Sequence, residues 1–232
     1  MALQKPTIVL FDMDGTTVRH INPWLLHILE RLDDAAHKIA ALVSKLFHRK
    51  IESPPLVEFR DGKRKKLLVH RAMHRLRRKD VEQIVEPCPG IYDVLDFLQD
   101  NKIPMAIISN GLGKGYGHDV LRKFDLERFF DITIFREDIT RAKPWPDPIL
   151  QALDGMKRKP NKDDIIWYIG DRGKDVKAAL AAELYLPCDI QPVAYNLNAA
   201  IAVLEHNVGP DHIIRAWPDL LTKLQQLFTK AA

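Results

Sequence analysis

Two aspartates near the start of the chain are the residues whose types and spacing best suit chemistry. The apolar run 8–11 is followed at once by Asp12 and Asp14, and Gly15 comes next. Such a short apolar run with a polar end is typical of a buried strand in a parallel sheet. Side chains two apart on an extended backbone point the same way, so both carboxylates would face one site at the carboxyl end of the strand. By themselves, these residues are equally compatible with a strand that ends in a solvated turn.

Further polar groups follow later apolar runs in the same way. Ser109 directly follows one run, Asp171 and Asp175 follow another, and Lys143 stands further behind a third. The carboxyl ends of parallel strands meet at one edge of a sheet, so these groups would join the first two aspartates in a single site. Each has a structural alternative: Ser109 as a helix cap, Asp175 as a first-turn helix residue, and Lys143 as a solvated turn residue.

The elements that would position these groups alternate along the chain. Apolar runs predict strands at 7–11, 104–108, 131–135, 165–169, 190–195 and 213–214. Helical spacing of apolar residues predicts helices near 91–98, 120–124, 147–157, 174–183, 198–205 and 218–228. This alternation indicates an α/β fold with a doubly wound, mainly parallel sheet and a Rossmann-like core.

The segment between the first two predicted strands has a different character. Helical spacing predicts helices over about 22–46 and 65–84, and no strand pattern is convincing between 18 and 86. We therefore predict a core domain formed by residues 1–17 and 87–232, into which residues 18–86 are inserted as a small helical cap domain.

The composition is that of an ordinary globular protein. Of the 232 residues, 46% are hydrophobic and 28% are charged. No apolar run approaches the roughly 18 residues needed to cross a bilayer, and the N-terminus lacks the apolar core of a signal peptide. Cys88 and Cys188 show no CxxC spacing. We expect a soluble cytoplasmic protein with no membrane partner and two reduced thiols in its core.

One segment carries most of the positive charge. Residues 60–80 contain ten Lys and Arg against two Asp, whereas the whole chain has a net charge of only +4. Arg71, Arg75 and Arg78 fall on one side of the predicted helix. Three interpretations stay open: a solvated surface, a face that attracts an anionic substrate, and a site for nucleic-acid phosphates. Aromatic residues are not interleaved with the basic ones, so a stacking platform for single strands is not evident.

Four short motifs, in order, make the chain resemble the haloacid dehalogenase-like hydrolase superfamily, in its phosphatase branch. Asp12-Met13-Asp14-Gly15-Thr16 is similar to the first motif of that superfamily, and Ser109-Asn110-Gly111 is similar to the second. Lys143-Pro144 is similar to the third motif, and Gly170-Asp171-Arg172-Gly173-Lys174-Asp175 is similar to the fourth. Each motif is weak alone, and their order and strand context make the resemblance specific. It covers nearly the whole chain, and the insert is similar to the helical cap of the phosphoglycolate phosphatase-like subgroup.

The resemblance implies a phosphatase that acts on a small phosphorylated metabolite, a phosphate monoester. Asp12 would attack the phosphorus and carry an aspartyl-phosphate intermediate. Asp14 would protonate the leaving oxygen and then activate water, while Lys143 would stabilise the phosphoryl oxygens. The implied substrate-binding residues are those of the second motif, Ser109, Asn110 and Gly111.

The resemblance also implies a bound Mg²⁺ ion. A phosphate ester and a carboxylate repel one another, and a hard cation held by oxygen ligands offsets that repulsion. The implied ligands are Asp12, Asp171 and the backbone carbonyl of Asp14. Asp175 would be either a direct ligand or a partner of the ligands.

Two functional alternatives stay open beside hydrolysis. A phosphomutase of the same superfamily needs the same core aspartates and differs in the acceptor of the phosphoryl group. A nucleic-acid-binding protein would instead use the basic segment. The oligomeric state is expected to be a monomer or a homodimer.

The sequence departs from the pattern of many relatives just after the first motif. Thr17 stands where many have Leu, and Arg19 and His20 replace the acidic or Ser residues often found there. These departures leave the identity of the substrate open. A run of alternating glycines after the second motif predicts either a phosphate cradle or a mobile loop beside the site. These glycines are Gly111, Gly113, Gly115 and Gly117.

Overall fold

The computed structural model describes residues 2–21 and 81–229. The chain divides into two compact units, Met1–His20 with Val81–Ala232, and Ile21–Asp80. Nearly all of the second unit lies outside the described residues, as do the basic segment and most of the two helices predicted for the insert. The division into a core domain and a helical cap domain therefore stays a prediction.

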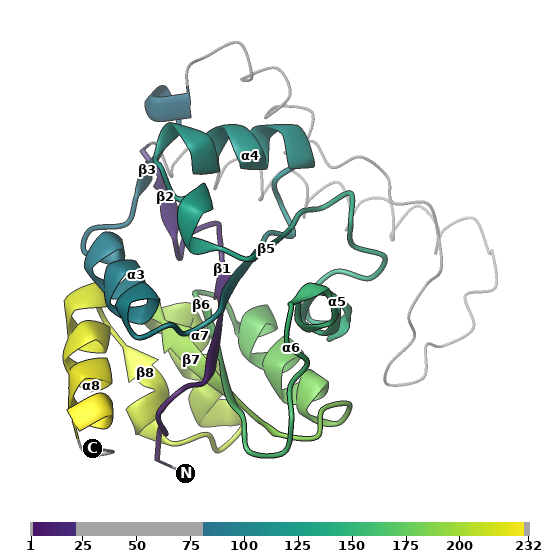
Figure 1. Ribbon diagram of the computed structural model, residues 1–232, viewed down its shortest axis with the longest axis vertical. Helices are drawn as coiled ribbons and strands as arrows, with labels where there is room; N and C mark the ends of the chain where they lie inside the picture. The colour runs from purple at the N-terminus through teal and green to yellow at the C-terminus, as the bar shows by residue number, and fades with distance from the viewer. Residues whose placement is uncertain (1, 22–80, 230–232) are drawn as a thin grey trace, which may run out of the picture. The chain divides into compact units, whose positions relative to one another are not determined.

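A six-stranded parallel sheet forms the centre of the described part of the chain (Figure 1). Its strands are β1 (Ile8–Asp12), β4 (Met105–Ile108), β5 (Ile132–Ile134), β6 (Ile165–Gly170), β7 (Asp189–Tyr195) and β8 (Ile213–Ile214). They lie in the order β5-β4-β1-β6-β7-β8, and all neighbouring pairs are parallel. This arrangement confirms the predicted α/β fold with a parallel, Rossmann-like sheet.

Helices cover both faces of this sheet. They are α3 (Ile91–Asp100), α4 (Lys114–Lys123), α5 (Asp147–Gly155), α6 (Gly173–Glu183), α7 (Asn196–Glu205) and α8 (Trp217–Thr229). In Figure 1, α3 and α8 lie on one side of the sheet, and α5 and α6 lie on the other. Short 3-10 helices add η1 (Val81–Gln83), η2 (Glu127–Phe129) and η3 (Pro210–His212). Within residues 2–21 and 81–229, no helix has the length and apolar character needed to cross a membrane.

Apolar packing on both faces fixes β1, and all five of its residues are buried. On the side of α5 and α6, Leu10 belongs to the same buried cluster as Ala179 of α6. On the opposite side, the ring of Phe11 lies 5.8 Å from that of Phe130 and 6.0 Å from that of Trp217, between centroids. Full burial of one such large side chain stabilises a fold by about 1.5–3 kcal/mol. The carboxyl end of β1 is therefore held rigidly.

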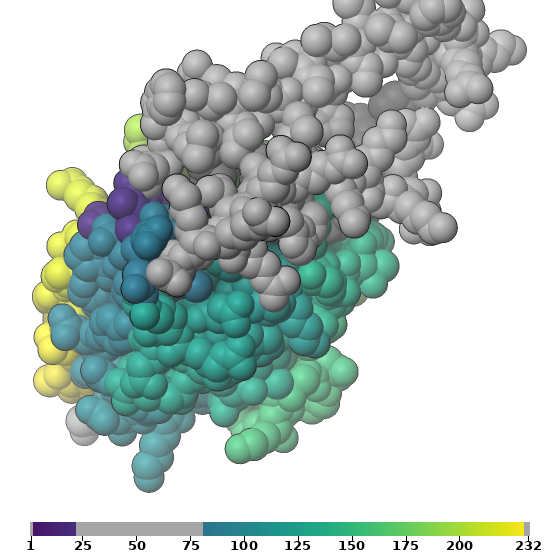
Figure 2. Space-filling model, turned by 90° about the horizontal axis from the view of Figure 1, so that it is seen from above, coloured from purple at the N-terminus to yellow at the C-terminus, as the bar shows by residue number. Residues whose placement is uncertain are grey.

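A second, two-stranded sheet stands at the edges of the insert, where we expected no strand. Its antiparallel strands are β2 (Val18–His20) and β3 (Val85–Pro87). Arg19 and Glu86 face one another, and the Arg19 Nε donates a hydrogen bond of 2.7 Å to the carboxylate. Figure 2 shows the start of the chain, in purple, beside the blue residues that follow position 81. Each strand has three residues and a charged centre, which is too short and too polar for an apolar pattern to reveal.

The prediction for the glycine run is wrong in its second half. Helix α4 begins at Lys114, so Gly115 and Gly117 are helical and belong to no mobile loop. Gly117 is buried against Phe135, where a Cβ would lie only 2.1 Å from a ring carbon. This glycine therefore serves close packing between α4 and the residue that follows β5.

Both cysteines are buried in the core, as predicted, and they are not bonded to each other. Burial raises the pKa of Cys88 to about 11 and also raises the pKa of Cys188. Both thiols are therefore protonated at neutral pH, as befits a structural cysteine.

Candidate active site

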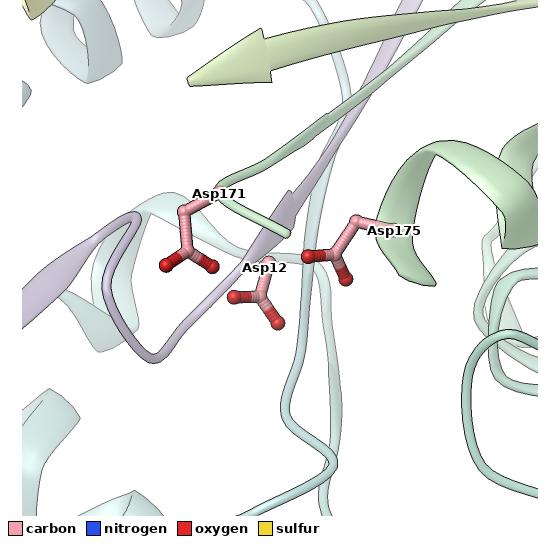
Figure 3. A group of neighbouring side chains, drawn as sticks. All are labelled: Asp12, Asp171 and Asp175. Atoms are coloured by element: carbon pink, nitrogen blue, oxygen red, sulfur yellow. The ribbon is translucent and has the colours of Figure 1, made fainter. Parts of the chain in front are cut away.

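Three carboxylates meet at the carboxyl edge of the sheet (Figure 3). Asp12 is the last residue of β1, Asp171 directly follows β6, and Asp175 lies in the first turn of α6. One oxygen of each lies within 4.8 Å of one oxygen of each of the others. The register between β1 and β6 pairs Phe11 with Ile169, which brings the ends of the two strands together. The predicted convergence of the first and fourth motifs is thus present in the geometry.

A tight loop after β1 lets Asp171 approach. Gly15 has a φ of +87°, a conformation that residues with a side chain rarely adopt. A Cβ at this position would lie 2.4 Å from Asp171 Oδ2. The Gly15 amide donates to the Val18 carbonyl at 2.8 Å, which closes the loop. Glycine is therefore required here both by the turn and by the carboxylate beside it.

Two threonine hydroxyls in this loop hold Asp12, and neither threonine was predicted to be a site residue. Thr17 Oγ1 donates to the Asp12 carbonyl at 2.8 Å, and Thr16 Oγ1 donates to Asp12 Oδ2 at 3.4 Å. Both threonines are fully buried. Leu at position 17, as in many relatives, would lack the hydroxyl that bonds the Asp12 backbone. This departure therefore has a local structural role.

Lys143 reaches the carboxylates from the segment that precedes α5, and its side chain is fully buried. Its Nζ donates to Asp12 Oδ1, forms an ion pair of 2.8 Å with Asp175 Oδ1, and donates to Tyr168 Oη at 2.7 Å. Burial and three partners rule out the alternative of a solvated turn lysine. Tyr168 was not among the predicted site residues.

Ser109 connects the second motif to Asp14. Its hydroxyl donates to Asp14 Oδ2 at 2.7 Å and accepts a hydrogen bond from the Leu112 amide at 2.9 Å. The serine therefore bonds the amide of the following turn and holds a site carboxylate, but it does not cap α4, whose N-cap is Gly113 without a side-chain cap, so the capping alternative is wrong. Asp14 does not belong to the group formed by the other three carboxylates. Its side chain is thus available for a different task.

Asn110 and Gly111 differ in what they contact. The Asn110 side chain binds the backbone of Lys143 twice: its Nδ2 donates to the carbonyl at 3.2 Å, and its Oδ1 accepts from the amide at 3.3 Å. It thereby links the second and third motifs. Gly111 is exposed, and a Cβ there would lie 3.3 Å from Asp14 Oδ2. The predicted contact of both residues with substrate stays a prediction.

Burial and mutual repulsion perturb the carboxylates. Burial is the largest cause that raises the pKa of Asp12 to about 7; Lys143 opposes it, and the charges of Asp175 and Asp171 add to it. Burial and the neighbouring Asp175 raise the pKa of Asp171 to about 6. The pKa of Lys143 lies well above its usual value, because the attraction of Asp12 and Asp175 outweighs the effect of burial. Burial and mutual repulsion of the carboxylates therefore outweigh the attraction of Lys143 and of the further cations Arg172 and Lys174.

The donor set fits a hard divalent cation. Asp171 Oδ1 is buried and accepts no hydrogen bond from the residues that the structure describes. A buried carboxylate oxygen without a partner is costly, and a cation would satisfy it. Asp175 Oδ1 pairs with Lys143 but likewise accepts no hydrogen bond from the described residues, and its Oδ2 accepts from the Arg172 amide at 3.0 Å. Asp12, Asp171 and Asp175 therefore all offer oxygens to a cation, and the role of Asp175 as direct ligand or partner stays a prediction.

Comparison with known proteins agrees with this geometry. A family model described as haloacid dehalogenase-like hydrolase matches residues 9–186. The chain belongs to the haloacid dehalogenase-like hydrolase family. This membership confirms the resemblance seen in the motifs and the expectation of a hydrolase.

Several proteins are similar to this haloacid dehalogenase-like chain over most of its length. Pyrophosphatase PpaX from Halalkalibacterium halodurans is 26% identical over 223 residues, 92% of this chain and 94% of that protein. A phosphorylated carbohydrates phosphatase from Thermotoga maritima is 24% identical over 224 residues, 92% of this chain and 99% of that protein. A hydrolase of this superfamily from Ehrlichia chaffeensis has a solved structure with a TM-score of 0.59 and 20% identity, covering 98% of this chain and 100% of that chain. At that identity the structural likeness shows the fold.

The predictions made for the basic segment lie outside the described residues. They concern Arg71, Arg75 and Arg78, the attraction of anionic substrates, and the binding of nucleic acid. The expected monomer or homodimer also stays a prediction.

Proposed function

We propose that the chain is a Mg²⁺-dependent phosphatase that hydrolyses a small phosphate monoester through an aspartyl-phosphate on Asp12. One observation carries the proposal: a buried lysine lies between two of three clustered carboxylates, and one of these ends the central strand of the sheet. The names of the two relatives described above, a pyrophosphatase and a phosphorylated carbohydrates phosphatase, support the same class of reaction.

Asp12 is the nucleophile in this proposal. The hydroxyls of Thr16 and Thr17 and the ammonium of Lys143 hold its carboxylate and its backbone in one orientation. Attack by a fixed carboxylate avoids much of the entropy cost of bringing two groups together. The new bond joins a carboxylate oxygen to phosphorus, and the bond from phosphorus to the leaving oxygen breaks.

Asp14 is the proton donor and acceptor. It lies two residues from Asp12, outside the carboxylate cluster, and the Ser109 hydroxyl orients its Oδ2. In the first step it gives a proton to the leaving oxygen. In the second it takes a proton from the water that hydrolyses the acyl phosphate. Ser109 therefore acts on the proton transfer through Asp14, in addition to its predicted contact with the phosphate.

Asp12 and Asp171 would hold the metal ion, together with the backbone carbonyl of Asp14. When bound, Mg²⁺ supplies positive charge that keeps the carboxylates ionised and offsets the charge of the phosphate. Lys143 contributes a further positive charge that is fixed in place before the substrate arrives. Preorganised charge of this kind stabilises the oxygens of a phosphoryl group during its transfer.

A substrate screen tests the proposal. Purified protein is assayed for phosphate release from a panel of phosphorylated metabolites with Mg²⁺ present and again with a chelator. The panel includes pyrophosphate and sugar phosphates, after the names of the two relatives described above, and phosphoglycolate, after a phosphoglycolate phosphatase from Escherichia coli that is 29% identical over 136 residues, 59% of this chain and 50% of that protein. The proposal predicts turnover of at least one compound, abolished by chelation and restored by Mg²⁺. Formation of an isomeric sugar phosphate without phosphate release would indicate the phosphomutase alternative, and no metal-dependent turnover of any compound would contradict both.

A further inference from the structure

The ammonium of Lys143 has one neutral partner besides its two carboxylates. An ammonium carries three N–H donors, and here the side chain is fully buried, so none of them reaches water. Asp12 Oδ1 accepts one donor and Tyr168 Oη accepts another at 2.7 Å, while Asp175 Oδ1 is an ion-pair partner at 2.8 Å that accepts no hydrogen bond from the part of the chain that the structure describes. The ammonium nitrogen also lies 5.4 Å from the centroid of the tyrosine ring. Tyr168 thus contacts Lys143 through both its hydroxyl and its ring.

The strand fixes the position of the Tyr168 hydroxyl. Tyr168 lies in β6, paired with Leu10 of β1, so its side chain points to the same face of the sheet as that of Asp12. It is 1% exposed and packs in the cluster formed with α5 and α6. Burial raises the pKa of Tyr168 well above its usual value, so the phenol is uncharged. The acceptor offered to Lys143 is therefore rigid and neutral.

A neutral acceptor does something that a further carboxylate would not. It satisfies one N–H without adding negative charge to a site where three carboxylates already repel one another. It also holds the ammonium against the pull of two carboxylates, because a shift toward either would break the bond to Tyr168. Without the hydroxyl, a buried N–H would lose its partner and the ammonium would be free to move.

We propose that Tyr168 is a positioning residue that fixes the Lys143 ammonium for phosphoryl transfer. The inference rests on the proposed function for its effect on turnover, and on the contacts alone for its effect on Lys143. A misplaced charge in an active site, or a lost supporting hydrogen bond, lowers activity by about 10- to 100-fold. Tyr168→Phe should therefore lower kcat by about that factor and change KM for a small aryl phosphate by less than about twofold.

Tyr92→Phe is the matched control. The Tyr92 hydroxyl donates to the Phe124 carbonyl at 2.6 Å from helix α3, so this change also removes one partly buried tyrosine hydrogen bond. Both substitutions keep the aromatic ring and remove one oxygen. Kinetic constants are referred to the folded fraction, measured by circular dichroism. Tyr92→Phe should keep kcat within about twofold of the wild type, since its hydroxyl bonds a backbone carbonyl away from Lys143.

A second measurement does not depend on activity. In protein labelled with ¹⁵N at the lysine side chains, a buried and hydrogen-bonded ammonium exchanges its protons slowly and gives a distinct signal, which Lys143→Arg identifies by its loss. We expect proton exchange at this ammonium to be at least about tenfold faster in Tyr168→Phe and unchanged in Tyr92→Phe.

The outcomes separate the inference from the proposed function. A lower kcat together with faster ammonium exchange in Tyr168→Phe alone supports the inference. An unchanged ammonium signal in Tyr168→Phe overturns it, whatever happens to kcat, and so does an equal loss of kcat in Tyr92→Phe. If the wild-type protein hydrolyses no phosphate ester, the proposed function fails, and the ammonium signal still decides whether Tyr168 fixes Lys143.

Discussion

Gly15→Ala should disable the site while leaving most of the fold intact. Gly15 has a φ of +87°, and a Cβ there would lie 2.4 Å from Asp171 Oδ2. Ordinary van der Waals contact begins at 3.4 Å, so the Asp171 carboxylate would have to retreat by about 1 Å. The substitution therefore acts directly on a proposed metal ligand.

Gly15→Ala should have two effects that can be measured separately, one on stability and one on activity. The left-handed backbone conformation should cost about 1–2 kcal/mol of the free energy of unfolding when a Cβ is present. Displacement of a catalytic group by about 1 Å should lower kcat by about 100-fold. A displaced ligand should also raise the Mg²⁺ concentration for half-maximal activity, by about tenfold or more.

Gly90→Ala provides the matched control. Gly90 has a φ of +82° at the start of α3, and its added Cβ would meet Pro218 Cδ at 3.1 Å. It should cost a similar free energy of unfolding and leave kcat within about twofold of the wild type. The assay is phosphate release at a series of Mg²⁺ concentrations, together with urea unfolding of all three proteins. The reasoning is refuted if Gly15→Ala keeps wild-type kcat and Mg²⁺ dependence, or if Gly90→Ala loses as much activity.

Three further substitutions test other parts of the account. Asp14→Asn should lower kcat by about 10²- to 10⁴-fold with an alkyl phosphate, and by less with an activated aryl phosphate that needs little proton donation. Ser109→Ala should lower kcat by about tenfold or more, because Asp14 Oδ2 loses its 2.7 Å hydrogen bond. Asp164→Asn should lower the free energy of unfolding at pH 7 by about 2 kcal/mol, because the buried carboxylate accepts two hydrogen bonds of 2.7 Å from Arg158. These bonds hold the pKa of Asp164 below its usual 3.8. The stabilisation should therefore be complete above that pH and should fade as the pH falls toward the lower folded value.

Each of these expectations has a clear contrary result. Equal losses by Asp14→Asn on alkyl and aryl phosphates would argue against proton donation. Wild-type kcat in Ser109→Ala would show that the bond to Asp14 is dispensable. For Asp164 the control is Asp154→Asn, since Asp154 pairs with Lys159 at an exposed position. This control should lower the free energy of unfolding by less than about 1 kcal/mol. A difference between wild type and Asp164→Asn that stays constant from neutral to acid pH would contradict the assigned pKa.

The sheet was predictable because its strands are short apolar runs that end in polar residues. Strands that are buried on both faces, such as β1 and β6, consist almost entirely of apolar residues. An uninterrupted apolar run in the sequence therefore indicates such a strand. Strands β2 and β3 escaped prediction because each has only three residues, with Arg19 or Glu86 at its centre, and shows no apolar pattern. Each forms a strand only by pairing with the other. The first turns of α4 escaped prediction because glycines weaken helices. The glycine at position 117 is explained by its packing on Phe135, a tertiary contact that the sequence does not show.

The site was predictable to the extent that parallel strands bring their carboxyl ends to one edge. That rule gathers Asp12, Ser109 and Asp171 without any knowledge of side-chain contacts. It says nothing of Tyr168, which reads as one more core residue of an apolar strand. Its bond to Lys143 depends on the path of the loop before α5, which sequence spacing does not encode. The one sequence feature that pointed to Tyr168 was its hydroxyl, because a tyrosine in an apolar strand usually needs a hydrogen-bond partner. The register then places its side chain on the same face of the sheet as that of Asp12.

Turnover by purified Asp12→Asn tests the central claim most directly. The amide is nearly isosteric with the carboxylate, so the fold should survive, but it cannot serve as the nucleophile. With Mg²⁺ and the best substrate from the screen, we predict a loss of at least about 1000-fold in kcat, in protein shown by mass spectrometry to be free of deamidation. Activity within about tenfold of the wild type in that same preparation would contradict the assignment of Asp12 as the nucleophile.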